Sequence, residues 1–489
     1  MSASPKIRLK GEGEWRAATR RLAADEATLV SLWGDERRMR MALREADGAL
    51  VLVETACDDG AFPSVAALHA PASRLERAAC DLFGFTATDA PDVRRWLDHG
   101  RWPLRHPLAD EPAAHDGAAD AYAFLEAKGP GLHQIPVGPV HAGIIEPGHF
   151  RFHAGGEAVV RLEERLGYKH KGVDALICGA NLERAAILAA RVSGDSTVAY
   201  SIAFARAVEA ALGVDATPRA QTLRGVMAEL ERLANHFGDI GAICNDAAFA
   251  LMHAHCGVLR ERTLRAAKTA FGHRLMMDAV VPGGCSVDLA PEGAEAIGAQ
   301  IRESRATFPK LVQLYDNTAS LQDRTVGTGV LKGDLARLFG AGGVVGRASG
   351  RNFDARRQHP YPPYDNLGFE VPTRREGDVN ARIWVRIDEV FESLDLIEKM
   401  LAAIPRGPVR AELPASAARR EGFALVEAFR GDVFVHVRLA DDGSIARCHL
   451  RDASWFQWPL LEAAIEGNIV ADFPLCNKSF NCSYSGCDL

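Results

Sequence analysis

The sequence lacks long hydrophobic runs, and this absence excludes several classes of protein. No stretch of about 18 or more apolar residues occurs among its 489 residues, so no segment is predicted to span a membrane. The first residues, MSASPKIRLKGEGEW, contain no apolar core of signal-peptide length. We therefore expect a soluble protein located in the cytoplasm.

Concentrated positive charge and paired cysteines are also missing. The chain has 57 basic and 64 acidic residues, a net charge of −7 and no basic block, which argues against a nucleic-acid partner. None of its ten cysteines forms a C-x-x-C pair, so buried thiols are expected rather than disulfides or zinc ligands. The remaining composition, 47% hydrophobic and 25% charged, is that of a globular chain with room for two or three domains.

Residues 1–108 have the pattern of a small α/β domain. ALVLVETAC, at 49–57, is typical of a strand, and SRLERAACDLFGF, at 73–85, is amphipathic and predicts a helix that ends at Gly84. Residues 109–135 are rich in Ala, Asp, Gly and Pro and are predicted to form a linker.

Residues 136–489 predict a second, mainly α-helical domain with a small β portion. A long helix is expected to begin at Thr217-Pro218, with proline at its first position and apolar residues at 3-4 spacing behind it. Residues 424–452 alternate like a hairpin closed at Asp442-Gly443. The predicted fold is thus an α+β N-terminal domain followed by a mainly helical domain.

One turn, RVSGDS at 191–196, interrupts two helical segments rich in small residues. It resembles the first ligand segment of nickel–iron hydrogenase large subunits, Arg-x-Cys-Gly-x-Cys. Arg191 and Gly194 are in register with that motif, whereas Ser193 and Ser196 stand at the two ligand positions. A hydroxyl is a poor ligand for a soft metal that selects thiolate.

The last residues, SFNCSYSGCDL, resemble the tail that holds the other two nickel ligands in energy-converting hydrogenases, S-F-D-P-C-Y-S-C. An ungapped alignment places Ser483 and Gly486 at the ligand positions. A shift by one residue recovers Cys482 but puts Ser485 at the second position. The resemblance therefore implies that all four ligand positions are lost, and that this chain binds no metal.

Ordered motifs in both parts resemble subunits of respiratory complex I. The N-terminal part carries Glu76-Arg77, Asp81 and Phe83-Gly84, followed by PDVRRWL and WPLRHPL, and is similar to the small (30-kDa-type) subunit. The second part is similar to the quinone-site (49-kDa-type) subunit and to the large subunit of group 4 hydrogenases. The segments that carry this likeness are 138–152, 167–174, 229–236, 271–285, 323–331, 346–364 and 377–394.

The resemblance also implies partners and cofactors. We expect no cofactor on this chain, an iron–sulfur cluster on a small partner subunit, and a quinone as a candidate substrate. Integral subunits of a membrane arm would attach the chain peripherally to the inner face of the cell membrane.

Three ionisable residues lie close together in the first hairpin of the second part. His141, Glu146 and His149 fall within nine residues, flanked by Pro and Gly. Such a group predicts a proton-handling cavity. A satisfied structural network is the alternative, and the resemblance to the lining of the quinone cavity favours the first.

Arg191 cannot lose its charge, so if enclosed it needs a carboxylate beside it. Glu146 and Asp246 are the candidates, because Asp246 matches the acidic residue that partners the quinone-site histidine of the family. The predicted catalytic residues are His141, Glu146, His149, Arg191 and Asp246, and the predicted cavity positions are Ser193, Gly194, Ser196 and Ser483. Gly194 stands where the family places a quinone-pairing tyrosine.

Three functions remain open on the sequence. The first is a redox core subunit of a membrane-associated oxidoreductase, the second a non-catalytic scaffold that transmits conformational change, and the third an active nickel–iron hydrogenase. The third is disfavoured because the register supplies no thiolate. The Arg356-Arg357 pair is expected to form a solvated or inter-subunit charge patch.

Overall fold

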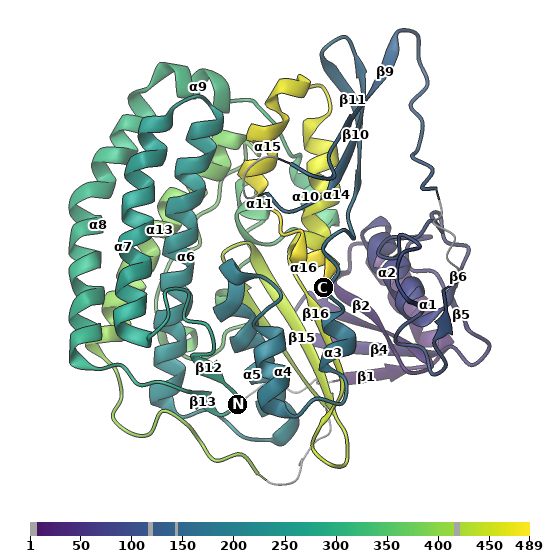
Figure 1. The fold of residues 1–489 in the computed structure, drawn as a ribbon, viewed down its shortest axis with the longest axis horizontal. Helices are drawn as coiled ribbons and strands as arrows, with labels where there is room; N and C mark the ends of the chain where they lie inside the picture. The colour runs from purple at the N-terminus through teal and green to yellow at the C-terminus, as the bar shows by residue number, and fades with distance from the viewer. Residues whose placement is uncertain (1–6, 116–120, 142–144, 415–420) are drawn as a thin grey trace.

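The computed structural model describes residues 7–115, 121–141, 145–414 and 421–489. It has three regions, arranged side by side in Figure 1: an N-terminal α/β unit, a central β-sheet and a bundle of long helices. The α+β fold followed by a mainly helical part is confirmed. No helix among these residues is both long and apolar enough to cross a bilayer.

The N-terminal unit is built on a four-stranded sheet in the order β1-β4-β3-β2, with β1 parallel to β4 and the other pairs antiparallel. Its elements are β1 (Ile7–Lys10), α1 (Glu12–Ala23), β2 (Ala27–Asp35), β3 (Arg38–Glu45), β4 (Leu50–Ala56), β5 (Ala61–Pro63), η1 (Ala70–Ala72), α2 (Ser73–Phe83) and β6 (Thr86–Thr88). Gly84 ends α2 in the left-handed conformation, φ 75°, as its sequence predicts.

A three-stranded sheet, in the order β11-β10-β9, projects beside this unit (Figure 1). The elements that follow the N-terminal unit are β7 (Leu104–Arg105), β8 (Ala113–Ala114), β9 (Leu132–Val137), β10 (His149–Gly155) and β11 (Ala158–Arg165). Residues 132–135 of the predicted linker therefore belong to β9, which pairs with β10.

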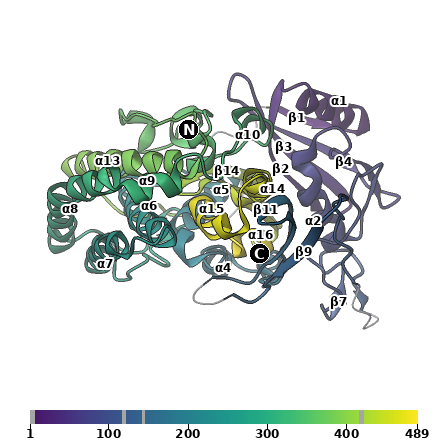
Figure 2. The same ribbon diagram turned by 90° about the horizontal axis from the view of Figure 1, so that it is seen from above.

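The helical part begins with α3 (Val173–Ile177), α4 (Leu182–Ala189), η2 (Gly194–Ser196), α5 (Thr197–Leu212), α6 (Pro218–Asp246), α7 (Ala250–Phe271), β12 (Val280–Val281), β13 (Gly284–Cys285), α8 (Pro291–Asn317), α9 (Ala319–Thr325), α10 (Gly333–Leu338), α11 (Gly343–Ala348), α12 (Ala355–Gln358), η3 (Tyr364–Asn366) and α13 (Val379–Ala402). Helices α6, α7, α8 and α13 lie side by side (Figures 1 and 2). The Thr217 hydroxyl caps α6 by accepting from the Ala220 N–H, and Pro218 occupies the first turn.

The last part of the chain returns to the centre of the molecule. It contains β14 (Glu421–Ala428), β15 (Gly431–Leu439), β16 (Ile445–Arg451), α14 (Ser454–Ile465), η4 (Val470–Asp472), α15 (Phe473–Phe480) and α16 (Ser485–Asp488). Helix α5 lies on β14, where Gly422 is needed because a Cβ there would stand 2.1 Å from the Ala207 carbonyl oxygen. Figure 2 shows α14, α15 and α16 between the helices and the N-terminal unit.

The N-terminal sheet is fixed to the central sheet by buried aromatic and polar contacts. Trp33 of β2 stacks on His449 of β16, with 4.9 Å between ring centroids, and Ser31 Oγ lies 2.7 Å from His449 Nε2. Arg451 donates to the Val30 carbonyl oxygen at 2.8 Å. One apolar core also runs from Trp15 and Phe62 through Phe150 to Trp458. The two sequence regions therefore share their packing.

Candidate functional site

The turn predicted from the hydrogenase-like motif follows the end of α4 and forms η2. Ser193 Oγ donates to Asp195 Oδ1 at 2.5 Å, and Ser196 Oγ reaches the same oxygen at 3.3 Å. Asn235 of α6 donates from Nδ2 to the Asp195 carbonyl oxygen at 2.8 Å. The two serines at the ligand positions thus turn toward Asp195, which the sequence did not single out.

Arg430, between β14 and β15, lies across this turn. Its guanidinium donates to both carboxylate oxygens of Asp195, at 2.9 and 2.7 Å, and to Ser196 Oγ at 3.0 Å. On its other side, Arg430 Nε donates to the Asn481 carbonyl oxygen at 2.5 Å. Burial opposes ionisation of Asp195, but the charge of Arg430 holds the pKa of this carboxyl below its usual range. Arg430 therefore connects the turn to the C-terminal tail.

Ser483 of the tail forms hydrogen bonds both within the tail and with α14. Ser483 Oγ accepts from the Gly486 N–H at 2.9 Å, and the Ser483 N–H donates to Ser454 Oγ at 2.8 Å. Gly486 packs so closely on Asp452 that a Cβ would stand 2.7 Å from its Cγ. Cys482 is buried beside these residues, so neither alignment of the tail leaves an accessible thiol pair.

The first hairpin reaches the tail through Glu146. This half-buried side chain accepts from the Ser485 N–H at 3.1 Å. His141 Nε2 lies 2.8 Å from the Gly148 carbonyl oxygen, within the hairpin. His149 Nδ1 lies 3.3 Å from the Gly138 carbonyl oxygen, and its Nε2 accepts from Arg151 at 3.3 Å. Burial lowers the pKa of His149, which favours the neutral ring.

The prediction that Glu146 or Asp246 pairs with Arg191 is wrong, because Arg191 binds Asp278 instead. Its guanidinium forms two hydrogen bonds with Asp278, at 3.0 and 2.7 Å, and both side chains are substantially exposed. Glu146 binds the tail instead, and Asp246 is exposed at the end of α6. Because Arg191 is not enclosed, it needs no buried carboxylate.

Asp239, about two turns of α6 before Asp246, is the buried carboxylate on this side. It accepts from Asn481 Nδ2 at 2.9 Å, from Lys478 at 3.2 Å and from Arg386 at 3.2 Å. Its contact with Asn481 places it next to the Arg430 bridge between turn and tail. The sequence could have indicated Asp239, because it is an acidic residue beside Phe237 and Ile240 on the apolar face of α6.

The structure therefore brings the predicted positions Ser193, Ser196 and Ser483 into one region, with Glu146 on the other side of the tail. Gly194 is exposed, and a Cβ there would meet only Met277 and Leu275 at 3.6 and 3.9 Å. Within the described residues, no group of three or more His, Cys, Asp or Glu side chains is arranged to hold a metal ion.

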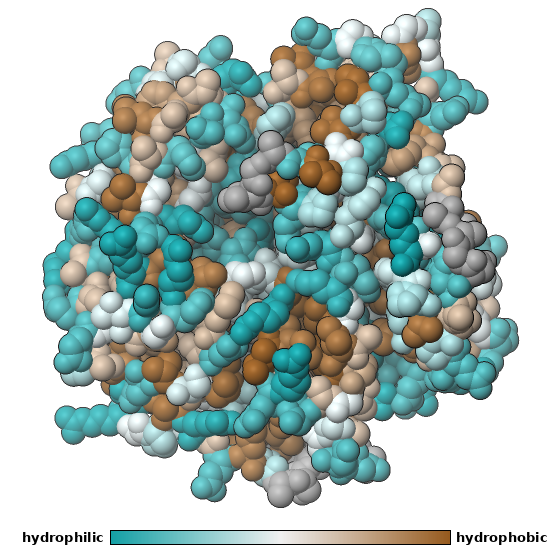
Figure 3. All heavy atoms as spheres, in the orientation of Figure 1, coloured by the Kyte–Doolittle hydropathy of each residue, from teal (hydrophilic) through white to brown (hydrophobic). Residues whose placement is uncertain are grey.

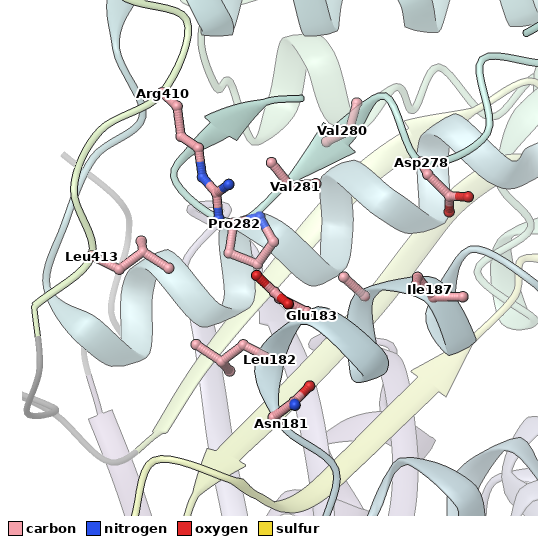
Figure 4. A pocket seen from close by; sticks show the side chains of 11 residues that line it. Asn181, Leu182, Glu183, Ile187, Asp278, Val280, Val281, Pro282, Arg410 and Leu413 are labelled. Carbon is pink, nitrogen blue, oxygen red and sulfur yellow. The ribbon is translucent and has the colours of Figure 1, made fainter. Parts of the chain in front are cut away.

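Two cavities border this region. The one that reaches Asp195 has a volume of about 20 Å³, room for about one water molecule. A pocket of about 520 Å³ lies beside Asp278, between α4, the β12–β13 hairpin and residues 410–413 (Figure 4). Hydrophobic side chains gather on this part of the surface (Figure 3). None of the nine predicted site residues lines the larger pocket.

Two family descriptions match the chain. Residues 17–114 match the respiratory-chain NADH dehydrogenase 30 Kd subunit, and residues 246–422 match the 49 Kd subunit. Formate hydrogenlyase subunit 5 of Escherichia coli (strain K12) is 31% identical over 447 residues, covering 90% of this chain and 79% of that protein. The chain belongs to the family of fused complex I 30-kDa and 49-kDa subunits and related hydrogenase large subunits.

Some relatives in this family are named as hydrogenase components and others as subunits of NADH-quinone oxidoreductase. Hydrogenase-4 component G of the same organism is 31% identical, covering 95% of this chain and 82% of that protein. The C/D subunit of NADH-quinone oxidoreductase from Bacteroides thetaiotaomicron is 27% identical, covering 87% and 85%. A chain in the structure of the membrane-bound sulfane sulfur reductase, an archaeal respiratory membrane complex, superimposes with a TM-score of 0.69 at 24% identity. The match covers 73% of this chain and 98% of that one, which shows a shared fold.

Proposed function

We propose that the chain is the redox core subunit of a membrane-associated oxidoreductase and works without a nickel–iron centre. The observation that carries this proposal is the Arg430 bridge, defined as the contacts of Arg430 with Asp195, Ser196 and Asn481. It joins the turn and the tail, the two segments that would have to supply nickel ligands. Its contacts engage the Asp195 carboxylate and the Ser196 hydroxyl of the turn and the Asn481 carbonyl oxygen of the tail.

The donor chemistry points the same way. Nickel selects thiolates, whereas the four aligned positions are Ser193, Ser196, Ser483 and Gly486. Three neutral hydroxyls and a glycine do not fit the metal, so no step of the proposed reaction passes through one. We expect electrons to arrive from an iron–sulfur cluster on a partner subunit and to leave to a quinone.

The partners in this proposal are an iron–sulfur small subunit and a membrane arm on the inner face of the cell membrane. Support comes from relatives whose names describe membrane-bound hydrogenase and NADH-quinone oxidoreductase. Among the predicted site residues, Glu146 is the one we assign to proton exchange, because it combines a carboxylate with contact to the tail.

The test is a complex purified from native membranes through a tag on this chain. We expect iron–sulfur and polytopic membrane proteins to co-purify, no nickel by elemental analysis, and no hydrogen-dependent dye reduction. Quinone reduction should fall in Glu146→Gln but not in Glu157→Gln, a matched change at the exposed turn between β10 and β11. About one nickel per chain would overturn the proposal.

A scaffold function is the second candidate, and the Arg430 bridge also favours it because the bridge fills space between turn and tail. Variants of the same purified complex distinguish the redox function from the scaffold function. If Glu146→Gln and Asp246→Asn both assemble normally and leave electron transfer and ion translocation unchanged, the scaffold function replaces the redox one.

A further inference from the structure

Two glutamates of the second part of the chain share one arginine of the N-terminal unit. Arg74 of α2 donates from Nη1 to Glu164 Oε2 at 3.2 Å and from Nη2 to Glu462 Oε1 at 2.7 Å. Glu164 lies on β11 and Glu462 on α14, which packs beside β11 (Figure 1). The Glu164 N–H also donates to Glu462 Oε1 at 2.7 Å. The two carboxylates therefore meet at one guanidinium.

The charges of this group do not balance when both carboxyls are ionised. The Glu164 side chain is 0% exposed and that of Glu462 is 22% exposed. Glu164 Oε1 is buried and has no hydrogen-bond partner among the described residues. A buried carboxylate oxygen without a donor is costly, and protonating that oxygen removes the excess negative charge. Burial raises the pKa of both carboxyls, and Glu462 raises that of Glu164 further.

Among the residues that the structure describes, the groups around the pair supply no second compensating cation. Glu163, the neighbour on β11, is occupied by Arg94 at 2.6 Å and by the Tyr122 hydroxyl at 3.2 Å. Trp96 covers the Arg74 guanidinium, 4.6 Å from its ring centroid. The tail contributes the buried thiol of Cys482, whose pKa rises through burial and then through Glu164.

The pair lies behind the tail that contacts Glu146. Glu164 is opposite Phe150 in the β10–β11 register, and the Phe150 ring lies 6.5 Å from that of Tyr484. Tyr484 packs against Gly148, and its charged neighbours include both Glu164 and Glu146. The next residue of the tail, Ser485, donates to Glu146. Tyr484 thus stands between the pair and Glu146.

We propose that Glu164 and Glu462 together hold one proton in the resting protein and supply it to the site at Glu146. This inference rests on the redox function proposed above. An electron from the iron–sulfur partner gives a quinone in the site one negative charge, and the proton leaves Glu164 Oε1 to neutralise it. The pair remains as two carboxylates on Arg74 until Glu462, which is partly exposed, takes a proton from water.

The protonation state can be tested without turnover. Infrared spectra of the purified complex at about pH 7, far above the usual range for a carboxyl, should contain an absorption of protonated carboxylic acid that Glu164→Gln removes. Glu462→Gln should shift or remove the same absorption, because it breaks the shared site. If the wild type and both variants have identical carboxylic acid absorptions, both glutamates are ionised and the proposal is wrong.

The supply of protons is tested by turnover. Glu164→Gln preserves shape, so the complex should assemble, and quinone reduction should fall about 100-fold, the lower end for loss of a positioned acid. Glu76→Gln is the matched control, since Glu76 is another buried carboxyl whose pKa is raised by burial, to about 7, but it binds Ser64 and the N–H groups of Val65 and Ala66. We expect it to keep wild-type turnover.

Unchanged turnover in Glu164→Gln would overturn the supply role even if the infrared absorption is lost. Failure of the redox function gives a different result, because a wild-type complex that reduces no quinone would still show the carboxylic acid absorption.

Discussion

Two arginines flank the same turn with nearly the same geometry and very different surroundings. Arg191 binds Asp278 at 3.0 and 2.7 Å, and Arg430 binds Asp195 at 2.9 and 2.7 Å. The side chains are 39% and 47% exposed in the first pair, but 7% and 35% exposed in the second. Solvent weakens the first pair, whereas loss of one partner from the second leaves a charge in a poorly solvated place. The sequence motif drew attention to Arg191, but burial means that Arg430 should contribute more to the free energy of unfolding.

The strongest way to break this comparison is Arg430→Ala. We expect a loss of about 3 kcal/mol in the free energy of unfolding, the lower end for breaking a buried pair because Asp195 keeps some contact with solvent. Urea unfolding measures it. The double variant Asp195→Asn/Arg430→Met should recover part of the loss, since no unpaired charge remains. A loss below about 1 kcal/mol would place Arg430 in the same class as Arg191.

A substitution at Gly486 tests how tightly the tail packs near the Arg430–Asp195 pair. An added Cβ would meet Asp452, which is fixed by the Tyr200 hydroxyl at 2.7 Å and by the Ser454 N–H at 2.8 Å. Gly486→Ala should therefore cost about 2 kcal/mol through overpacking. Gly257→Ala, in α7 with no atom near the added Cβ, should be neutral or stabilising. Equal effects of the two changes on unfolding would show that the tail yields easily.

The stability at low pH gives a further test of the comparison. Burial alone would raise the pKa of Asp195, but Arg430 outweighs burial and lowers this pKa in the folded protein. Stability from the ionised carboxylate is present above the unfolded pKa of about 3.9 and is lost as pH falls through and below it. One such proton changes the free energy of unfolding by at most about 1.4 kcal/mol per pH unit. Wild type should thus lose stability faster than Asp195→Asn below about pH 4. Parallel curves would remove the role assigned to Arg430.

The smallest effect is expected for Arg191→Ala. An exposed pair contributes about 0.2–1 kcal/mol, and salt screens it. The loss on unfolding should shrink further in high salt, whereas the loss in Arg430→Ala should persist. A salt-independent loss above about 2 kcal/mol would mean that Arg191 is enclosed in solution.

Local sequence signals predicted much of the fold. The Thr217-Pro218 start of α6, the Gly84 end of α2 and the hairpin at Asp442-Gly443 are all confirmed, because capping and turn chemistry depend on neighbouring residues. The prediction for Arg356 is wrong. It is 3% exposed and binds Asp354 and Glu229, and that partnership depends on how helices meet in space.

In the candidate site, too, local features could be predicted from the sequence, whereas contacts between distant residues could not. Motif register correctly indicated that Ser193 and Ser196 lie together in one turn, and it gave no indication that Asp195 between them binds an arginine 235 residues later. Glu164 was missed because Glu163 and Glu164 look alike in sequence. Only β11 register and the positions of Arg74 and Glu462 distinguish them.

The shared core between Trp15, Phe150 and Trp458 has a consequence for the covalent fusion itself. Burial of that core would hold the N-terminal unit in place even if the backbone were cut within the predicted linker, residues 109–135, since apolar contacts do not depend on chain continuity. A protease nick within the predicted linker, residues 109–135, should therefore leave two fragments that elute together in gel filtration. The covalent link would then fix the stoichiometry, one small unit for each large one, while the buried core holds the two units together.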